Sequence, residues 1–351
     1  KLSEKKSKQQ FLGLYIVGGK FMKNKIINIL ESAQENDATD IHIILESECG
    51  RIKFRQKGKM TDFQEISKDE FKRLINFLKF IAELDINEHK IPQSGKTTLK
   101  IKDEELVMRV STLPITLMDE VVVIRILDTL DKRPAQSLFI NKNEFEFFKD
   151  YMRLSQGLIL FTGPTGSGKS TLMSNLLNEV IKEGSRQVIS IEDPIEYEID
   201  GMVQVEINDK ANISYEPLLR GALRCDPDVL MFGEIRDKTI ARELLSASLS
   251  GHLVFSTFHS KSAVSTISRL KDFDLYDEEL KQSISLIINQ RILHTKSKSF
   301  IVYEYLTASD INDCLLGRKV SYRTLDDRLL TLKNEGHLND EEFSYYNQKF
   351  K

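Results

Sequence analysis

The sequence predicts an α/β protein of two domains, in which a small α/β domain precedes a doubly wound parallel sheet with a helical tail. Three observations lead to this prediction. The chain has 351 residues, which is long for one domain and sufficient for two. Its first part shows short strands of alternating polarity beside amphipathic helices. The remainder shows wholly apolar runs that alternate with helical stretches, as expected of strands buried on both faces of a parallel sheet.

The composition is that of a globular protein, with 29% charged and 40% hydrophobic residues. The 50 Lys and Arg against 53 Asp and Glu leave a net charge of −3, so we expect no direct nucleic-acid partner. The three cysteines at 49, 225 and 314 can form neither a disulfide framework nor a four-Cys zinc site. No apolar run approaches the roughly 18 residues of a membrane-spanning helix. These features predict a cytoplasmic protein.

Residues 1–21 differ in composition from the rest of the chain. Five Lys against one Glu make this segment basic, and its apolar run, 11–17, is short and lacks a good cleavage site for a signal peptide. Met22 then opens an amphipathic helix. We therefore hypothesise that Met22 is the native start and that residues 1–21 are a leader or a foreign addition. A basic, apolar arm that touches a membrane is the alternative.

Residues 22–127 are predicted to form the small α/β domain. Helical spacing of apolar residues predicts a helix over 71–84, and Gly58 indicates a turn between two strands. Residues 128–140, which contain Pro134, are predicted to be the linker. Strands are predicted at 41–45, 106–110 and 121–127, and another is predicted to begin with Ile52 and Phe54.

Residues 141–310 are predicted to form the larger domain. The run 157–161 is bounded by glycines and wholly apolar, which is typical of a central parallel strand. Strands that alternate with helices imply βαβ units and a doubly wound sheet. Residues 311–351 are polar and compatible with a helical tail. The other predicted strands lie at 188–191, 229–232 and 253–256.

A phosphate-binding motif follows the strand at 157–161. Residues 163–170 match G-x-x-x-x-G-K-[S/T] in full, which predicts a loop whose backbone N–H groups face phosphates at a helix N-terminus. We expect ATP and Mg²⁺ as cofactors, with Lys169 at the β- and γ-phosphates and Ser170 on Mg²⁺. A chance match in a glycine-rich turn is the alternative. The predicted nucleotide ligands are Gly163, Pro164, Thr165, Gly166, Ser167, Gly168, Lys169, Ser170 and Thr171.

Acidic residues follow two of the other predicted strands. Glu192 follows the strand at 188–191, and a carboxylate at this edge of a parallel sheet is well placed to orient an attacking water. Glu234 follows the strand at 229–232 and is predicted to act through Mg²⁺ and water. A solvated acidic loop is the alternative for Glu192, and an ordinary sheet strand is the alternative for the segment before Glu234.

Two histidines and two arginines complete the set of candidate catalytic residues. His252 and His259 flank the strand at 253–256 and are candidates for sensing the γ-phosphate, although a lone histidine is most often structural. Arg109 and Arg125 lie on predicted strands of the small domain. An arginine supplied by a second domain or subunit can stabilise the transition state of phosphoryl transfer; surface arginine is the alternative.

The order of these motifs resembles the secretion-superfamily ATPases, the motors of type II secretion, type IV pili and DNA-uptake pili. The resemblance runs from about residue 22 to 310 and rests on four linked motifs. In the small domain, residues 38–43, 84–96 and 108–114 are similar as well, and NQRIL at 289–293 resembles a Gln-Arg-Leu motif of the family. The four motifs are GPTGSGKST at 163–171 (Walker A), IEDPIEY at 191–197 (Asp box), LLRGALRCDPDVLMFGEIRD at 218–237 (Walker B) and SGHLVFSTFHS at 250–260 (His box).

The resemblance implies a PAS-like N-terminal domain and a RecA-like ATPase domain. It implies that Glu192 is the catalytic carboxylate and that Glu234 is the Walker B acid. His252 and His259 are then His-box residues, and Arg109 and Arg125 are arginine-finger candidates. The activity implied is hydrolysis of ATP to ADP and phosphate, coupled to mechanical work by a homohexamer at the cytoplasmic face of the membrane. The partner implied is a polytopic inner-membrane platform protein.

Departures from the family pattern narrow the expected function. Three scattered cysteines exclude the four-Cys zinc insert of extension and type II motors. Glu88, His89 and Lys90 stand where relatives often have arginines, and Lys57-Gly58 stands where Asp-Gly is common. These features favour a motor that assembles a competence pilus for DNA uptake in Gram-positive bacteria. The alternatives are a retraction or other secretion motor, a DNA translocase or helicase, and a non-catalytic nucleotide-binding scaffold.

Overall fold

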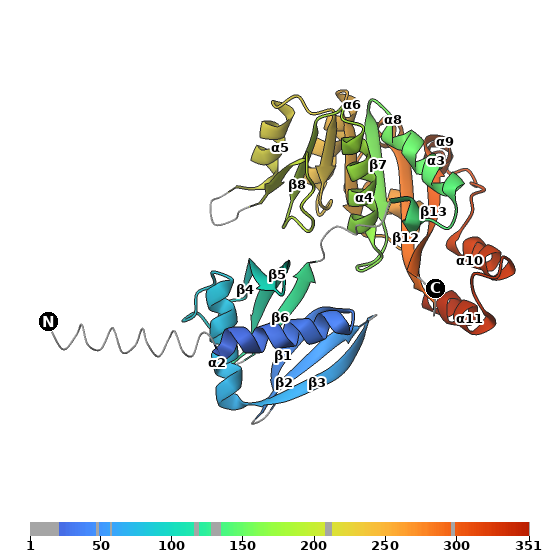
Figure 1. Ribbon diagram of the computed structural model, residues 1–351. Helices are drawn as coiled ribbons and strands as arrows, with labels where there is room; N and C mark the ends of the chain where they lie inside the picture. The colour runs from blue at the N-terminus through green and yellow to red at the C-terminus, as the bar shows by residue number, and fades with distance from the viewer. Residues whose placement is uncertain are drawn as a thin grey trace. The chain divides into compact units, whose positions relative to one another are not determined.

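The computed structural model describes residues 21–46, 49–56, 58–115, 119–127, 135–207, 213–295 and 299–350. The chain divides into two compact units, Lys1–Thr129 and Leu130–Lys351 (Figure 1). Residues 1–20, to which the hypothesis of a leader applies, lie outside the described ranges. Within those ranges, no helix is both long and apolar enough to cross a bilayer.

The first unit contains a six-stranded sheet in the order β3-β2-β1-β6-β5-β4, in which neighbouring strands pair antiparallel. The helix over residues 21–35 and α2 (Lys68–Ile81) pack on this sheet and share one apolar core with it (Figure 1). The strands are β1 (Ala38–Glu46), β2 (Cys49–Gln56), β3 (Lys59–Ser67), β4 (Gln93–Ile101), β5 (Glu104–Pro114) and β6 (Glu120–Leu127).

One strand and one helix end of this unit differ from expectation. The turn expected at Gly58 implies a strand after it, and β3 pairs there with β2, although only Ile66 of its nine residues is buried and no alternation of polarity marks its bounds. Strand β4, which was not predicted, is largely polar and forms a hairpin with β5 around Lys102 and Asp103. Helix α2 ends at Ile81 rather than at residue 84, because Glu83 adopts a left-handed conformation with φ of 56° that a helix cannot include.

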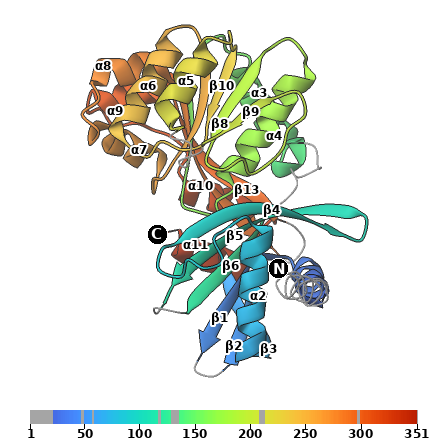
Figure 2. The same ribbon diagram turned by 90° about the vertical axis from the view of Figure 1, so that its left-hand side faces the viewer.

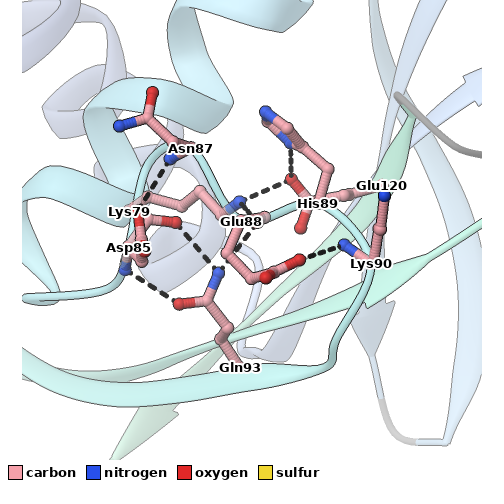
Figure 3. Close-up of polar contacts among 8 residues, drawn as sticks. All are labelled: Lys79, Asp85, Asn87, Glu88, His89, Lys90, Gln93 and Glu120. Atoms are coloured by element: carbon pink, nitrogen blue, oxygen red, sulfur yellow. Dashed lines mark hydrogen bonds and ion pairs between the residues drawn. The ribbon is translucent and has the colours of Figure 1, made fainter.

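A buried ionic cluster anchors the loop after α2 (Figure 3). Lys79 has no exposed surface, and its Nζ lies 2.6 Å from Oε2 of Glu120 and 2.6 Å from the carbonyl oxygen of Glu88. Nδ1 of His89 lies 2.8 Å from the same Oε2 of Glu120. This one carboxylate therefore connects α2, the loop and β6.

The second unit contains a seven-stranded sheet in the order β13-β12-β7-β11-β10-β8-β9. Neighbouring strands are parallel except for the antiparallel edge pair β12–β13. The predicted α/β class is confirmed, although β9, β12 and β13 were not predicted. The strands are β7 (Gly157–Thr162), β8 (Val188–Glu192), β9 (Val203–Glu206), β10 (Val229–Phe232), β11 (Leu253–Phe258), β12 (Ile284–His294) and β13 (Ser299–Thr307).

Helices cover both faces of this sheet (Figure 2). Leu158 and Leu160 of β7 point to one core, whereas Ile159 and Phe161 point to the other, which explains why the strand is wholly apolar. Helices α3 (Lys142–Met152) and α4 (Lys169–Lys182) pack on the second core. The first core is covered by α5 (Tyr215–Leu223), α6 (Lys238–Leu249), α7 (Ala263–Lys271), α8 (Asp277–Ser283) and α9 (Ala308–Leu315).

The segments that flank the sheet also pack on the second unit. In the predicted linker 128–140, residues 128–134 lie outside the described ranges, and the 3-10 turn η1 (Ala135–Leu138) contributes Ala135 and Leu138 to the core beside α3. The predicted helical tail is confirmed. It contains α9, α10 (Leu325–Asn334) and α11 (Asp340–Lys349), and the last two cover a smaller apolar cluster with β12 and β13.

Candidate nucleotide-binding site

The loop between β7 and α4 has the backbone conformation that its glycines allow. Gly163, Gly166 and Gly168 have φ values of 140°, 75° and 80°, which residues with a Cβ rarely adopt. Gly168 is the N-cap of α4 and no side chain caps this helix, whereas Asn141 caps α3. The first turn of α4 therefore lacks a side-chain acceptor, and an anion at this helix N-terminus would supply one.

Strand β12 lies directly against the loop. A Cβ on Gly163 would lie 2.6 Å from the carbonyl oxygen of Gln290, and a Cβ on Gly168 would lie 2.9 Å from Cδ1 of Ile292. Nε2 of Gln290 donates a hydrogen bond of 2.8 Å to the carbonyl oxygen of Ser167. The glycines are therefore needed both for their φ values and for this close approach.

Lys169 is held inside the loop. Its Nζ donates to the carbonyl oxygens of Gly163 at 3.1 Å and Pro164 at 2.9 Å. Burial lowers the pKa of Lys169 to about 8, against the opposing attraction of Glu234 and Glu196. A phosphate oxygen is a stronger acceptor than a carbonyl, so a bound phosphate group fits this ammonium.

Glu192, at the end of β8, is buried with 5% of its surface exposed. Its Oε1 accepts hydrogen bonds from Oγ of Ser190 at 2.6 Å and Nε2 of Gln204 at 3.0 Å. Burial raises the pKa of Glu192, and these two hydrogen bonds oppose the rise. A fixed carboxylate whose pKa is raised toward neutrality is suited to accept a proton from water.

His259 connects the loop to the second acidic residue. Its Nδ1 lies 3.2 Å from the carbonyl oxygen of Gly163, and its Nε2 lies 3.2 Å from Oε1 of Glu234. The ring therefore lies between the nucleotide loop and the carboxylate of Glu234. Arg236 extends the cluster, with Nη1 at 2.8 Å from Asp193 and Nε at 3.5 Å from Glu234.

His252 lies at the opposite edge of the sheet. Strands β7 and β11 are parallel, and the backbone N–H of Gly157 bonds the carbonyl oxygen of His252 at 3.1 Å. Gly157 is the first residue of β7, whereas Gly163 follows its last residue. Nδ1 of His252 instead lies 3.1 Å from the carbonyl oxygen of Ala247. The structure therefore brings His259, and not His252, to the loop.

Arg109 and Arg125 belong to the first unit, where they are cross-strand partners on β5 and β6. Nε of Arg109 donates to Oγ of Ser94 at 2.7 Å. Nε of Arg125 donates to Oδ1 of the buried carboxylate of Asp40 at 2.8 Å. The two side chains emerge on one face of that sheet, and their role as arginine fingers stays a prediction.

Three groups of the site were missed from the sequence. Ser190 and Gln204 orient Glu192, and Gln290 supports the loop. Ser190 could have been found, because it precedes Glu192 by two residues on one strand and both side chains must point the same way. Gln290 belongs to the motif NQRIL at 289–293, but its contact with the loop depends on the pairing of β12 with β7. Gln204 comes from β9, whose neighbour only the fold determines.

Three comparisons relate the chain to known proteins. Residues 17–326 match the family described as Type II/IV secretion system protein. The chain is 35% identical over 266 residues to competence protein ComGA of Bacillus subtilis, covering 76% of this chain and 74% of that protein. It is 37% identical over 273 residues to the type II secretion system ATPase E of Vibrio cholerae, covering 77% of this chain and 54% of that longer protein.

The fold is also that of a solved structure. The pilus retraction motor PilT, whose structure contains bound ADP, superposes with a TM-score of 0.66 at 23% identity. The match covers 91% of this chain and 95% of that one. It therefore includes strands and helices of both units.

Proposed function

Because the chain belongs to the type II/IV secretion system protein family, we propose that it is an ATP-hydrolysing motor that drives assembly of a competence pilus for DNA uptake. One observation carries the hydrolytic part of the proposal. Lys169, His259, Glu234 and Glu192 lie at the carboxyl ends of the four neighbouring parallel strands β7, β11, β10 and β8, beside a glycine loop at a helix N-terminus. The similarity to competence protein ComGA supports the assignment to competence.

The geometry suggests a role for each residue in hydrolysis. The N-terminus of α4 and Lys169 bind the phosphates of ATP, with Lys169 exchanging its two carbonyl partners for phosphate oxygens. Glu192, oriented by Ser190 and Gln204, holds the attacking water and accepts its proton. His259 contacts both the loop and Glu234, so a shift of the loop on nucleotide binding would also shift this carboxylate.

The metal of the proposed reaction is Mg²⁺, which would neutralise phosphate charge when bound. Among the described residues, no group of three or more His, Cys, Asp and Glu could hold a metal ion alone. This fits Mg²⁺, which binds nucleotide phosphates together with one or two protein oxygens. Ser170 and Glu234 are the residues that would hold it.

The wider setting of the motor is part of the same proposal. We expect a homohexamer at the cytoplasmic face of the membrane, acting on a polytopic platform protein without binding nucleic acid itself. Arg109 and Arg125 are the residues expected to neutralise transition-state charge from a second domain or subunit. The sequence motifs at 38–43, 84–96 and 108–114 and the net charge of −3 support this setting.

A second candidate function is a motor of type II secretion or pilus retraction. The 37% identity to the Vibrio cholerae ATPase favours it. The two functions share the nucleotide site and differ in the assembly that the motor drives. Transformation frequency and secretion of exoproteins in a deletion strain distinguish them.

The test in cells is Lys169→Ala, compared with Lys182→Ala on the same helix. Lys182 is an exposed partner of Glu179 and touches no part of the loop. We expect Lys169→Ala to abolish pilus assembly and transformation at normal protein levels, while Lys182→Ala preserves both. Normal transformation in the Lys169→Ala strain would refute the proposal.

A further inference from the structure

Glu304, on β13, is a buried carboxylate that joins the first residues of two helices. It is 3% exposed. Its Oε1 accepts a hydrogen bond of 2.7 Å from the backbone N–H of Ala263, the first residue of α7. Its Oε2 accepts one of 3.0 Å from the backbone N–H of Leu325, the first residue of α10. Both oxygens accept, as in an ionised carboxylate, and each faces the positive end of a helix dipole.

Helix α7 continues directly from the segment that contacts the nucleotide loop. This segment, residues 259–262, is called here the sensor loop. His259 at its start contacts Gly163 and Glu234, and Arg269 of α7 donates a hydrogen bond back to the carbonyl oxygen of His259. The position of α7 therefore determines where His259 lies.

Strand β12 holds the sensor loop and the nucleotide loop together. Arg291 donates to the carbonyl oxygen of Lys261 at 2.7 Å. Asn289 donates to Oγ1 of Thr162, at the end of β7, at 2.9 Å and to the carbonyl oxygen of Ser260 at 3.2 Å. Asn289 is also the cross-strand partner of Glu304. A buried polar network thus runs from the base of the nucleotide loop to the sensor loop beside Glu304.

The other oxygen of Glu304 holds the C-terminal tail. Leu325 is buried, and α10 packs through Leu329 and Leu332 on a cluster that includes Leu293 and Val302 of β12 and β13. Thr324 caps α10 through its side chain. Helix α10 is therefore held by apolar packing and by the cap at Thr324 as well as by Glu304. The bond from the backbone N–H of Leu325 connects it to the same carboxylate that binds the start of α7.

We propose that Glu304 is a positioning residue that couples the C-terminal tail to the sensor loop, so that nucleotide at the loop and the packing of α10 influence each other. This inference rests on the proposed function of the nucleotide site. Coupling between two sites is reciprocal, so a nucleotide that restrains the sensor loop must also restrain the start of α10, and a change at α10 must alter nucleotide affinity. Because the sensor loop carries His259, which contacts Gly163 and Glu234, we expect turnover to change as well.

The first test is amide hydrogen exchange of Glu304→Gln, with Glu335→Gln as the matched control. The amide introduced by Glu304→Gln keeps the shape of the side chain but has one acceptor and one donor group, so one of the two backbone N–H groups loses its bond. Glu335 is exposed at the end of α10. Without nucleotide, we expect Glu304→Gln to accelerate exchange at least threefold at 259–266 and 325–330. Exchange in these segments equal to wild type would overturn the proposal.

The same measurement with Mg²⁺ and the non-hydrolysable analogue AMP-PNP tests the coupling itself. We expect the analogue to protect 163–170, 259–266 and 325–330 in the wild type, and to lose its effect on 325–330 in Glu304→Gln. Equal protection of 325–330 in both proteins, or none in the wild type, would refute coupling. Absence of protection at 163–170 would instead refute nucleotide binding, and the nucleotide-free comparison would still decide the role of Glu304.

Kinetics with Leu325→Pro separates positioning from simple loss of structure. Proline lacks the N–H and is favoured at the first position of a helix, and Thr324, with φ of −74° and ψ of 166°, suits the residue before it. We expect Glu304→Gln to lower kcat about tenfold. In Glu304→Gln the new side-chain amide group faces a backbone N–H, and two donors repel each other. Adding Leu325→Pro removes the backbone N–H of residue 325, so the double variant should have the kcat of Leu325→Pro alone. Additive losses of kcat would contradict the proposal.

Discussion

His259 contacts Glu234 at the nucleotide loop, with Nε2 of the ring 3.2 Å from Oε1 of the carboxylate. The other ring nitrogen lies 3.2 Å from the carbonyl oxygen of Gly163, so this one side chain contacts both the loop and the acidic residue after β10. His252, of the same residue type and beside the same strand, lies at the other sheet edge. The two histidines therefore form a natural pair of test and control.

Replacing His259 should impair turnover far more than replacing His252. We expect His259→Ala to lower kcat about 100-fold, the usual effect of removing one preorganised polar group from an active site. His252→Ala should stay within about twofold of wild type in the isolated protein, because its partners are Ala247 and Ser250. Steady-state phosphate release measures both. Equal losses in the two variants would contradict this assignment.

Nucleotide affinity should depend on pH through Lys169. Its pKa in the free protein, about 8, lies below the usual value of 10.5, and bound phosphates favour the charged form. Binding therefore takes up a proton above about pH 8, so the affinity for ATP should be constant below this pH and fall by up to tenfold per unit above it.

Lys169→Arg provides the control for this pH dependence. The guanidinium stays protonated throughout this range, so the affinity of the variant should be lower but nearly independent of pH between about 7 and 10. Fluorescence titration with a labelled nucleotide measures both proteins. A wild-type affinity that does not change from about pH 7.5 to 9.5 would show that Lys169 remains charged in the free protein.

The pH profile of kcat should respond to Ser190. The Ser190 hydroxyl donates to Glu192 and lowers its pKa, whereas burial raises it. Removing the hydroxyl therefore raises the pKa of Glu192, and because activity requires the ionised form, the acid limb of kcat should move to higher pH in Ser190→Ala. Ser248→Ala is the control, since its buried hydroxyl bonds the carbonyl oxygen of Leu245. If the acid limb of the kcat profile lies at the same pH in Ser190→Ala as in the wild type, Glu192 is not the titrating base.

The stability of the first unit should depend on Lys79 (Figure 3). Lys79→Met leaves the buried carboxylate of Glu120 without its cation, which typically costs about 3–5 kcal/mol in free energy of unfolding. Adding Glu120→Gln removes that charge and should recover part of the loss. Lys72→Met, at an exposed position of the same helix, should change stability by less than about 0.5 kcal/mol. Urea unfolding monitored by circular dichroism measures the free energy of unfolding of all three variants. An unchanged free energy of unfolding in Lys79→Met would show that Lys79 does not stabilise the buried charge of Glu120.

The parts of the site that the sequence predicts are those encoded locally. The glycines at 163, 166 and 168, the apolar run of β7 and the lysine after it are contiguous, so the motif alone predicts the loop. Strand direction would also have separated the histidines, since His259 follows β11 and His252 precedes it.

The unpredicted parts depend on contacts between distant segments. Gln290 reaches Ser167 only because β12 pairs in parallel with β7 in one particular register. Glu304 reaches Leu325 only because the tail turns back onto β13. The bounds of strand β3, a strand that the turn expected at Gly58 implies, could not be predicted for another reason: its exposed position removes the alternation of polarity by which a strand is recognised.

A rapid-quench measurement of ATP cleavage tests whether Glu192 activates the attacking water at the nucleotide site. Glu192→Gln keeps the shape of the side chain and can still interact with Ser190, but it cannot accept a proton. We predict that purified Glu192→Gln binds Mg²⁺–ATP with affinity close to that of wild type and cleaves it at least about 100-fold more slowly. Cleavage by Glu192→Gln at the wild-type rate would show that Glu192 does not accept the proton of the attacking water.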